Sequence, residues 1–410
     1  MNSGRPCRSS IILLADGLRP SSLGPYGNTW FDTHFVNRLA SESLLFEQCI
    51  SDSPDIQLGI RGILGGQHSC DRQTRPLQLL QRLAETDFQS HLITSDRNRI
   101  SDIETQFDRV IEIPSPENEI LARDLTDTSL ANFFAAVIQQ LREMTEPALL
   151  MLDCPAFSAP WDAPYPYRKN LADEEDPTPS DFVHPPSLQF NLATDDPDQL
   201  LDYQTAYNAQ AMLFDQMVGL LLDETKTSHS FKDALFCLTA TRAFPLGEHG
   251  VVGYYRPVLY NELLKVPALV HYPQPQKLFG RSQQLVQPGS LFDLLCNWHL
   301  GADDQMASAF PVIDKDYWLQ QKKSSAVVSK ITLDELEFCA IQTYAWKYIS
   351  GPAGKLFVKP DDIWEYNDAS ELCPEVFQAL HQELTRSLVS LGDGLRPEFD
   401  LPDALAFGVE

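Results

Sequence analysis

The chain has 410 residues, of which 57 are acidic and 31 basic, so its formal net charge is −26 at pH 7. Hydrophobic residues make up 43 %, a composition typical of a packed globular protein with one large domain or two to three smaller ones. The acidic balance argues against nucleic acid and against an anionic membrane surface as partners, because both require clustered Lys and Arg.

No apolar run reaches the ~18 residues that a membrane-spanning helix needs. The apolar run that follows residue 10 is cut by Asp16 and is too short for a signal peptide, so we expect a cytoplasmic location. The eight cysteines are scattered without a Cys-x-x-Cys pair, which indicates reduced thiols rather than a zinc or redox site.

Short apolar runs alternate with helical patterns along roughly the first 270 residues. The predicted strands are Ser10–Ala15, Leu44–Ile50, His91–Thr94, Arg109–Ile113, Ala148–Leu152, Ala234–Leu238 and Val266–His271. The predicted helices are Phe31–Ser43, Leu77–Leu83, Asp127–Met144 and Tyr203–Leu222. This alternation predicts an α/β domain over residues 1–303, with a mostly parallel sheet covered by helices on both faces. Functional groups in such sheets lie at the carboxyl ends of the strands.

Three segments depart from this pattern. Ala172–Asp198 contains eight acids and five prolines, so we expect a surface insertion without regular structure. Residues 304–330 are predicted to be a connection. Residues 331–410 are predicted to be a small α+β subdomain, with extended segments at Leu336–Lys347 and Lys355–Val358 before a helix at Pro374–Leu391.

Several motifs occur in a characteristic order. The first strand leads into Asp16-Gly-Leu-Arg and then Leu23-Gly-Pro-Tyr-Gly-Asn. A later turn reads Leu246-Gly-Glu-His-Gly, and Tyr260-Asn-Glu-Leu-Leu-Lys-Val-Pro follows it. Together with Ala159-Pro-Trp-Asp-Ala-Pro, these motifs resemble the sulfatases of the alkaline-phosphatase superfamily. The resemblance implies that superfamily's α/β fold with a small C-terminal subdomain.

The resemblance also implies a specific chemistry. Sulfatases use a divalent cation, usually calcium, and a formylglycine nucleophile made from the first residue of Cys/Ser-x-Pro-x-Arg. This chain has no such motif, and the nucleophile position falls on Ile56 or on Asp52, depending on the anchor. Asp52 and Ser53 are therefore only weak catalytic candidates, since Ser53 directly precedes Pro54 and has the wrong spacing.

Only one of the implied metal ligands is present. Asp16 is retained, but Gly17 stands where many sulfatases have a second Asp, and the distal ligand pair falls on Thr241 and Arg242. Arginine cannot coordinate a metal, because its guanidinium stays protonated and has no acceptor. We therefore predict that Arg242 takes the place of the metal and pairs with Asp16, although a surface position for Arg242 is an equally reasonable alternative.

The remaining positions implied by the resemblance have also changed. One lysine position falls near Ser95–Asp96 and another on Tyr254, while the histidine position falls on Ser158. Glu248 and His249 are retained, but their Gly-rich turn indicates a structural role. We describe Asp16, Ser158, Thr241, Arg242, Glu248 and His249 as a vestigial pocket.

Three functions remain open. The first is a catalytically inactive sulfatase-family protein, a pseudoenzyme that acts by binding or regulation, with no cofactor and with an unknown protein or small molecule as partner. The second is a metal-dependent sulfuric or phosphoric ester hydrolase with a rebuilt site, in which Asp16 would bind calcium and Asp52, Ser53 or Asp55 would serve as nucleophile or ligand. The third is a structural role in an assembly.

Overall fold

The computed structural model describes residues 8–408, except 87, 117, 159, 255–258, 274–278, 301–323 and 334–335. The chain forms two compact units. The first unit comprises Met1–Leu45, Arg82–Arg256 and Pro267–Gly280, and the second comprises Phe46–Gln81, Pro257–Val266 and Arg281–Glu410. Among the described residues, no helix is both long and apolar enough to cross a membrane.

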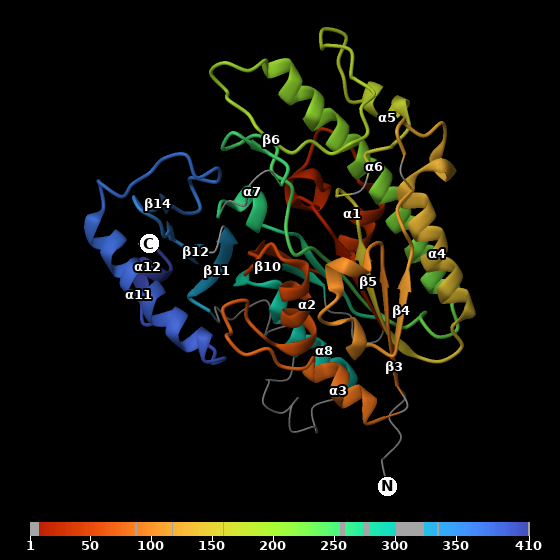
Figure 1. Ribbon diagram of the computed structural model, residues 1–410, viewed down its shortest axis with the longest axis horizontal. Coiled ribbons are helices and arrows are strands. Elements are labelled where there is room, and N and C mark those ends of the chain that lie inside the picture. Colours follow the sequence, from red (N-terminus) through yellow and green to blue (C-terminus); the bar gives the residue numbers. More distant parts are fainter. Residues whose placement is uncertain are drawn as a thin grey trace. The chain divides into compact units, whose positions relative to one another are not determined.

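An eight-stranded, mostly parallel sheet with flanking helices is the main element of the fold, as the sequence predicts (Figure 1). Its strands are β1 (Ser10–Ala15), β2 (Leu44–Cys49), β3 (Gln89–Thr94), β4 (Arg109–Glu112), β5 (Ala148–Cys154), β7 (Leu235–Thr239), β9 (Ala268–His271) and β10 (Gly280–Val286). Six of them lie within the first unit in the order β9-β7-β1-β5-β3-β4. Only β9 runs antiparallel to its neighbour β7 among the pairings described for these six strands.

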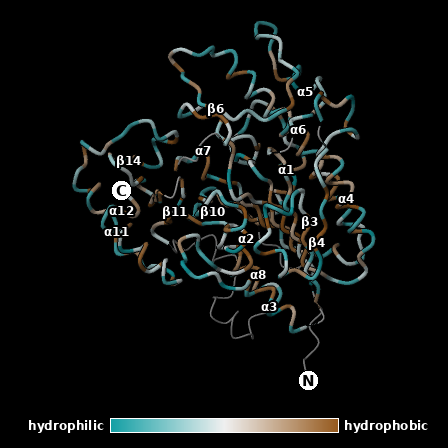
Figure 2. The backbone as a smooth tube through the Cα atoms, viewed as in Figure 1, coloured by the Kyte–Doolittle hydropathy of each residue, from teal (hydrophilic) through white to brown (hydrophobic). Residues whose placement is uncertain are grey.

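Helices of the first unit pack on one another beside this sheet. They are α1 (His34–Ser41), α4 (Ser129–Glu143), α5 (Tyr165–Lys169) and α6 (Pro197–Thr227). The long helix α6 contacts α1, α4 and α5. Every residue of β1 and β5 is buried, so these two central strands run through the hydrophobic interior (Figure 2).

The expected insertion is largely exposed, but it is not free of regular structure. Its residues Leu188–Gln189 form β6, which pairs with β8 (Val251–Val252), and α6 begins inside it at Pro197. The prediction was wrong here because a two-residue strand leaves no hydrophobic periodicity to detect. Trp161 is fully buried, and its backbone N–H donates to Val183 O at 2.7 Å, so Trp161 anchors the insertion.

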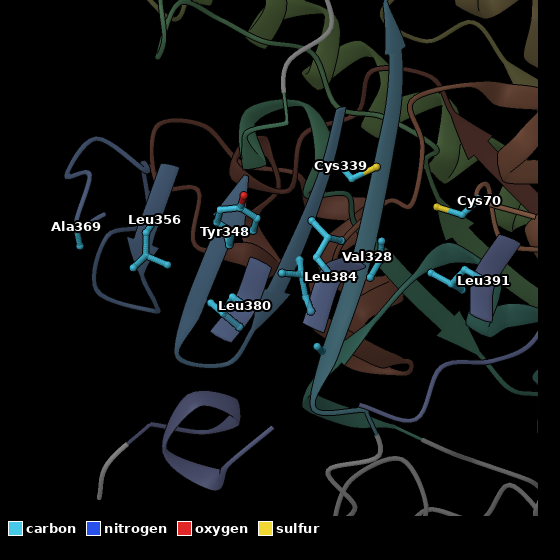
Figure 3. Packing of buried hydrophobic residues seen from close by; sticks show 11 residues of the cluster. Cys70, Val328, Cys339, Tyr348, Leu356, Ala369, Leu380, Leu384 and Leu391 are labelled. Carbon is cyan, nitrogen blue, oxygen red and sulfur yellow. The ribbon is translucent and has the colours of Figure 1, made fainter. Parts of the chain in front are cut away.

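The second unit contains a small antiparallel sheet with a helix packed against it (Figure 3). Its strands are β11 (Ala326–Leu333), β12 (Leu336–Thr343), β13 (Trp346–Ile349) and β14 (Lys355–Val358), and its helix is α11 (Pro374–Gly392). Ile341, Tyr348, Leu380 and Leu384 form the core of this part. Of the expected connection 304–330, residues 304–323 lie outside the described residues, and β11 begins at Ala326.

Further helices complete the described elements. They are α2 (Ile56–Gly65), α3 (Gln78–Ala84), α7 (Asn261–Leu264), α8 (Leu291–Leu300) and α12 (Asp403–Ala406). Helix α2 packs on α8 within the second unit. Asp55 caps α2, because its Oδ1 accepts the Leu58 N–H at 3.0 Å.

Candidate functional site

The carboxyl ends of neighbouring parallel strands bring charged side chains together in the first unit. Strand β1 lies between β5 and β7, and β3 pairs with β5. Asp16 follows β1, Asp153 lies near the end of β5, and Arg242 follows β7. The backbone holds this edge in register, since Asp16 N donates to Cys154 O at 3.0 Å and Gly17 N to Arg242 O at 3.2 Å.

Arg242 binds the Asp16 carboxylate with two hydrogen bonds, so the predicted ion pair is confirmed. Its Nε lies 2.6 Å from Oδ1, and its Nη2 lies 2.9 Å from Oδ2. This bidentate geometry is the strongest arrangement available to the two groups. The Asp16 side chain is 2 % exposed and the Arg242 side chain 23 %, so the pair lies largely out of water.

A second guanidinium reaches the same carboxylate. Arg99 Nη2 lies 2.8 Å from Asp16 Oδ2 and 3.4 Å from Asp153 Oδ1. Thr94 Oγ1 donates to the other Asp153 oxygen at 2.8 Å. We call Asp16, Arg99, Asp153 and Arg242 the Asp16 cluster. Two carboxylates face two guanidinium groups there, so the formal charges cancel.

Sequence reasoning missed Arg99 and Asp153. It placed the basic position after β3 near Ser95–Asp96, but Asp96 instead caps a short 3₁₀ turn, accepting the Asn98 N–H at 2.8 Å. That turn carries Arg99 back toward the strand ends. A basic residue within five positions of a strand end was the available signal for Arg99. Asp153, one residue beyond the predicted strand Ala148–Leu152, could have been found in the same way.

The two carboxylates of the cluster differ in acidity. Burial by itself would raise the pKa of Asp16, but the charges and hydrogen bonds of Arg242 and Arg99 outweigh it and lower the pKa to about 2. Burial raises the pKa of Asp153, and the opposing influence of Arg99 and Thr94 does not cancel it. Asp16 is therefore ionised at any ordinary pH, as the counter-ion of two arginines requires.

Tyr254 closes the space beside Asp16. Its ring lies under the Arg242 guanidinium, with Cζ 3.6 Å from the ring centroid. A Cβ atom placed on Gly17 would lie 2.8 Å from the Tyr254 hydroxyl oxygen, and the Gly17 backbone has a φ of +84°. A side chain at position 17, where many sulfatases have Asp, is therefore disfavoured both by the backbone and by Tyr254.

The other residues of the predicted pocket have different roles. Ser158 lies beside the Asp16 cluster, since its Oγ is 3.4 Å from Arg99 Nη1. Thr241 is buried next to Arg242. Glu248 forms an ion pair with Arg19, and His249 lies half-buried in the same turn between β7 and β8. Burial would raise the pKa of Glu248, but Arg19 lowers it to about 2.

The weak catalytic candidates belong to the second unit and lie in the loop before α2. Asp52 Oδ2 accepts the Ser69 N–H at 2.8 Å. Ser53 Oγ accepts the Asp55 N–H at 3.2 Å. Ile56, the other candidate nucleophile position, is the first residue of α2.

The residues of the Asp16 cluster do not fit the calcium ion that the family resemblance implies. A hard divalent cation needs several oxygen ligands. Both Asp16 oxygens are bound by guanidinium groups, and Asp153 faces one of them. Within the described part of the chain, no group of three or more His, Cys, Asp or Glu could hold a metal ion.

The fold matches the alkaline-phosphatase-like α/β fold of several solved hydrolases. A phosphonate monoester hydrolase of Agrobacterium radiobacter is 13 % identical, with a TM-score of 0.73, 94 % of this chain covered and 96 % of the other. BT4656, solved in complex with its substrate D-glucosamine-2-N,6-O-disulfate, is 14 % identical, with a TM-score of 0.72 and coverage of 94 % and 98 %. A putative sulfatase of Bacteroides thetaiotaomicron is 15 % identical, with a TM-score of 0.67 and coverage of 98 % and 96 %.

These structures establish the fold, and the sequence establishes the family. The family model named Sulfatase matches residues 8–298. The chain belongs to the sulfatase family. No curated protein matches it significantly.

Proposed function

We propose that this chain is a sulfatase-family protein that does not hydrolyse esters and acts by binding. One observation carries the proposal: Arg242 and Arg99 occupy both oxygens of Asp16, the carboxylate that corresponds to the family's metal ligand. Ester hydrolysis in this family needs a cation that polarises the sulfate oxygens and activates the nucleophile. A guanidinium can offset the charge of Asp16, but it cannot lower the pKa of a nucleophile by coordinating it.

The loop that would carry the nucleophile supports the same proposal. The nucleophile motif aligns to position 52 or position 56. These positions hold Asp52 and Ile56, and neither residue is Cys or Ser. The Ser53 side chain accepts a hydrogen bond from the backbone of its own loop, which is the behaviour of a turn residue.

Turnover of model esters tests the proposal. Purified protein is incubated with 4-nitrophenyl sulfate, 4-nitrophenyl phosphate and a phenylphosphonate monoester, with and without added calcium. We expect rates equal to those of buffer alone. Turnover that Asp16→Ala abolishes would establish the family's metal-dependent reaction instead. Turnover that Asp16→Ala leaves unchanged and Asp52→Asn abolishes would establish a rebuilt active site.

A further inference from the structure

A cavity of about 350 Å³ lies wholly within the second unit. Its walls come from the segment after α2, strand β10 and the turn that follows it, the start of β11 and the segment that follows α11. The volume is at the lower end of the range for small-molecule sites. The cavity therefore has the size of a small-molecule site.

Charged side chains line this cavity, and all but one have a partner of opposite charge. Asp293 is bound by Arg396 through two hydrogen bonds of 2.6 and 3.0 Å. Asp71 lies 3.6 Å from Arg75. Asp52 is the exception, since no cation of the described residues forms an ion pair with it. Among the described residues that line the cavity, the carboxylates thus outnumber the cations by one.

Asp52 is nearly buried, with 4 % of its surface exposed. One of its oxygens accepts the Ser69 N–H at 2.8 Å, and no hydrogen bond to its other oxygen is described. A bound cation would give this carboxylate the counter-ion that no described residue supplies.

The neutral polar groups of the cavity add no positive charge beside Asp52. Gln67, Gln284 and Gln287 contribute amides to the lining. His68 Nδ1 accepts the Cys70 N–H at 3.1 Å and its Nε2 lies 3.1 Å from Val328 O, a pattern that fits neutral imidazole. His68 therefore adds no positive charge opposite Asp52.

We propose that this cavity binds a small organic ammonium ion, with Asp52 as its counter-ion. An ammonium group donates up to three hydrogen bonds, which Asp52 and the neighbouring amide oxygens can accept. An anion is disfavoured by the unpaired carboxylate. A hard metal ion is disfavoured because Asp71 and Asp293 are already paired with arginine.

Calorimetry with a charged probe and its uncharged analogue tests the proposal. Wild-type protein is titrated with 1,4-diaminobutane and with butane-1,4-diol, which has the same length but no charge. We expect saturable binding of the diamine and none of the diol. Hydrogen exchange on the wild-type protein locates the bound diamine without any substitution. The diamine is expected to protect the backbone amides of residues 66–71 and 284–290.

Two isosteric variants test whether the Asp52 carboxylate is the group that binds the diamine. Asp52→Asn keeps an oxygen for the Ser69 N–H and removes only the charge, and we expect it to weaken diamine binding by at least about tenfold. Asp55→Asn removes the same charge from an exposed position of the same loop that does not line the cavity, and Asn also caps helices well. It should bind like wild type.

Four results would each overturn the proposal. They are equal binding of the diamine and the diol, no binding of either, equal losses in the two variants, and protection confined to segments outside the cavity. The first would show that the charge of the amine does not determine binding. The third would show that the net charge of the chain, rather than the Asp52 carboxylate, attracts the amine.

Discussion

At the scale of single residues, the account depends on the carboxylate of Asp16. Its oxygens receive three hydrogen bonds of 2.6 to 2.9 Å from Arg242 and Arg99. The pairing with Arg242 could be predicted from the sequence, because an arginine aligned with a metal ligand needs a carboxylate partner. The contribution of Arg99 was missed, because Arg99 lies in a 3₁₀ turn five positions beyond the strand end rather than at the strand end itself.

Removing the charge of Asp16 should destabilise the first unit. In Asp16→Asn, Arg242 loses the carboxylate that binds it and Arg99 keeps only its ion pair with Asp153. We therefore expect a loss of about 2–4 kcal/mol in the free energy of unfolding. Urea denaturation measures the free energy of unfolding. Asp223→Asn is the control, since it removes an exposed carboxylate that pairs with Arg38 and Lys226, and it should cost less than about 1 kcal/mol. Equal losses in the two variants would contradict the account.

The acidity of Asp16 predicts how stability depends on pH. The arginines hold the pKa of Asp16 at about 2, below its ordinary value of 3.8. Between these two pH values the unfolded chain therefore binds more protons than the folded chain. The contribution of Asp16 is therefore present above about pH 4 and is lost as the pH falls toward 2. Asp153 has a raised pKa, so its ionisation lowers the stability of the fold as the pH rises above 4.

Thermal unfolding between pH 2 and 5 measures this effect. Asp16→Asn should show a shallower loss of melting temperature below pH 4 than wild type, because its side chain does not titrate. Parallel curves for the two proteins would show that the Asp16 carboxylate is not held ionised by the arginines.

At the scale of elements, the turn after β1 is constrained by Tyr254. Gly17 and Gly27 both have left-handed backbones, with φ of +84° and +101°. A Cβ at Gly27 meets nothing within 4 Å, whereas a Cβ at Gly17 would lie 2.8 Å from the Tyr254 hydroxyl oxygen and 2.9 Å from Phe157 Cβ. Comparing substitutions at Gly17 and Gly27 therefore separates the cost of backbone strain from the cost of steric conflict.

Alanine substitutions at these two glycines should differ in cost. Gly27→Ala should cost about 1–2 kcal/mol for its left-handed backbone alone. Gly17→Ala should cost about 1–3 kcal/mol more, because of overpacking against Tyr254 and Phe157. Chemical denaturation of the two variants gives the comparison. Equal costs would mean that Tyr254 leaves room for a side chain at position 17.

The elements that sequence reasoning missed lack the pattern on which such predictions depend. The strands β1 and β5 are continuous apolar runs, and both were predicted. Strand β10 places Ser282 and Gln284 on its buried face, so it lacks the hydrophobic alternation of a half-buried strand. Helix α2 contains three glycines, which lower its helix propensity although tertiary packing buries it.

At the scale of the whole molecule, the chain carries a formal net charge of −26 at pH 7. The Asp16 cluster is formally neutral, so the charge arises elsewhere, in part from the acidic segment Ala172–Asp198. Long-range repulsion should therefore keep polyanions away from the chain.

Chromatography on heparin tests this expectation. The chain should pass through a heparin column without retention at low salt, where electrostatic attraction is strongest. Retention that added salt reverses would reveal a basic surface and would restore sulfated polysaccharides as candidate ligands. A negatively charged protein of known behaviour on the same column is the control.

Calcium binding shows directly whether the two arginines exclude a metal ion from Asp16. Protein treated with EDTA and dialysed is titrated with calcium chloride by isothermal calorimetry. Because guanidinium groups occupy the Asp16 oxygens, we predict no saturable binding that depends on Asp16 and an unchanged melting temperature. Stoichiometric binding that Asp16→Asn removes would contradict the account, since it would show that Arg242 and Arg99 yield the carboxylate to a metal ion.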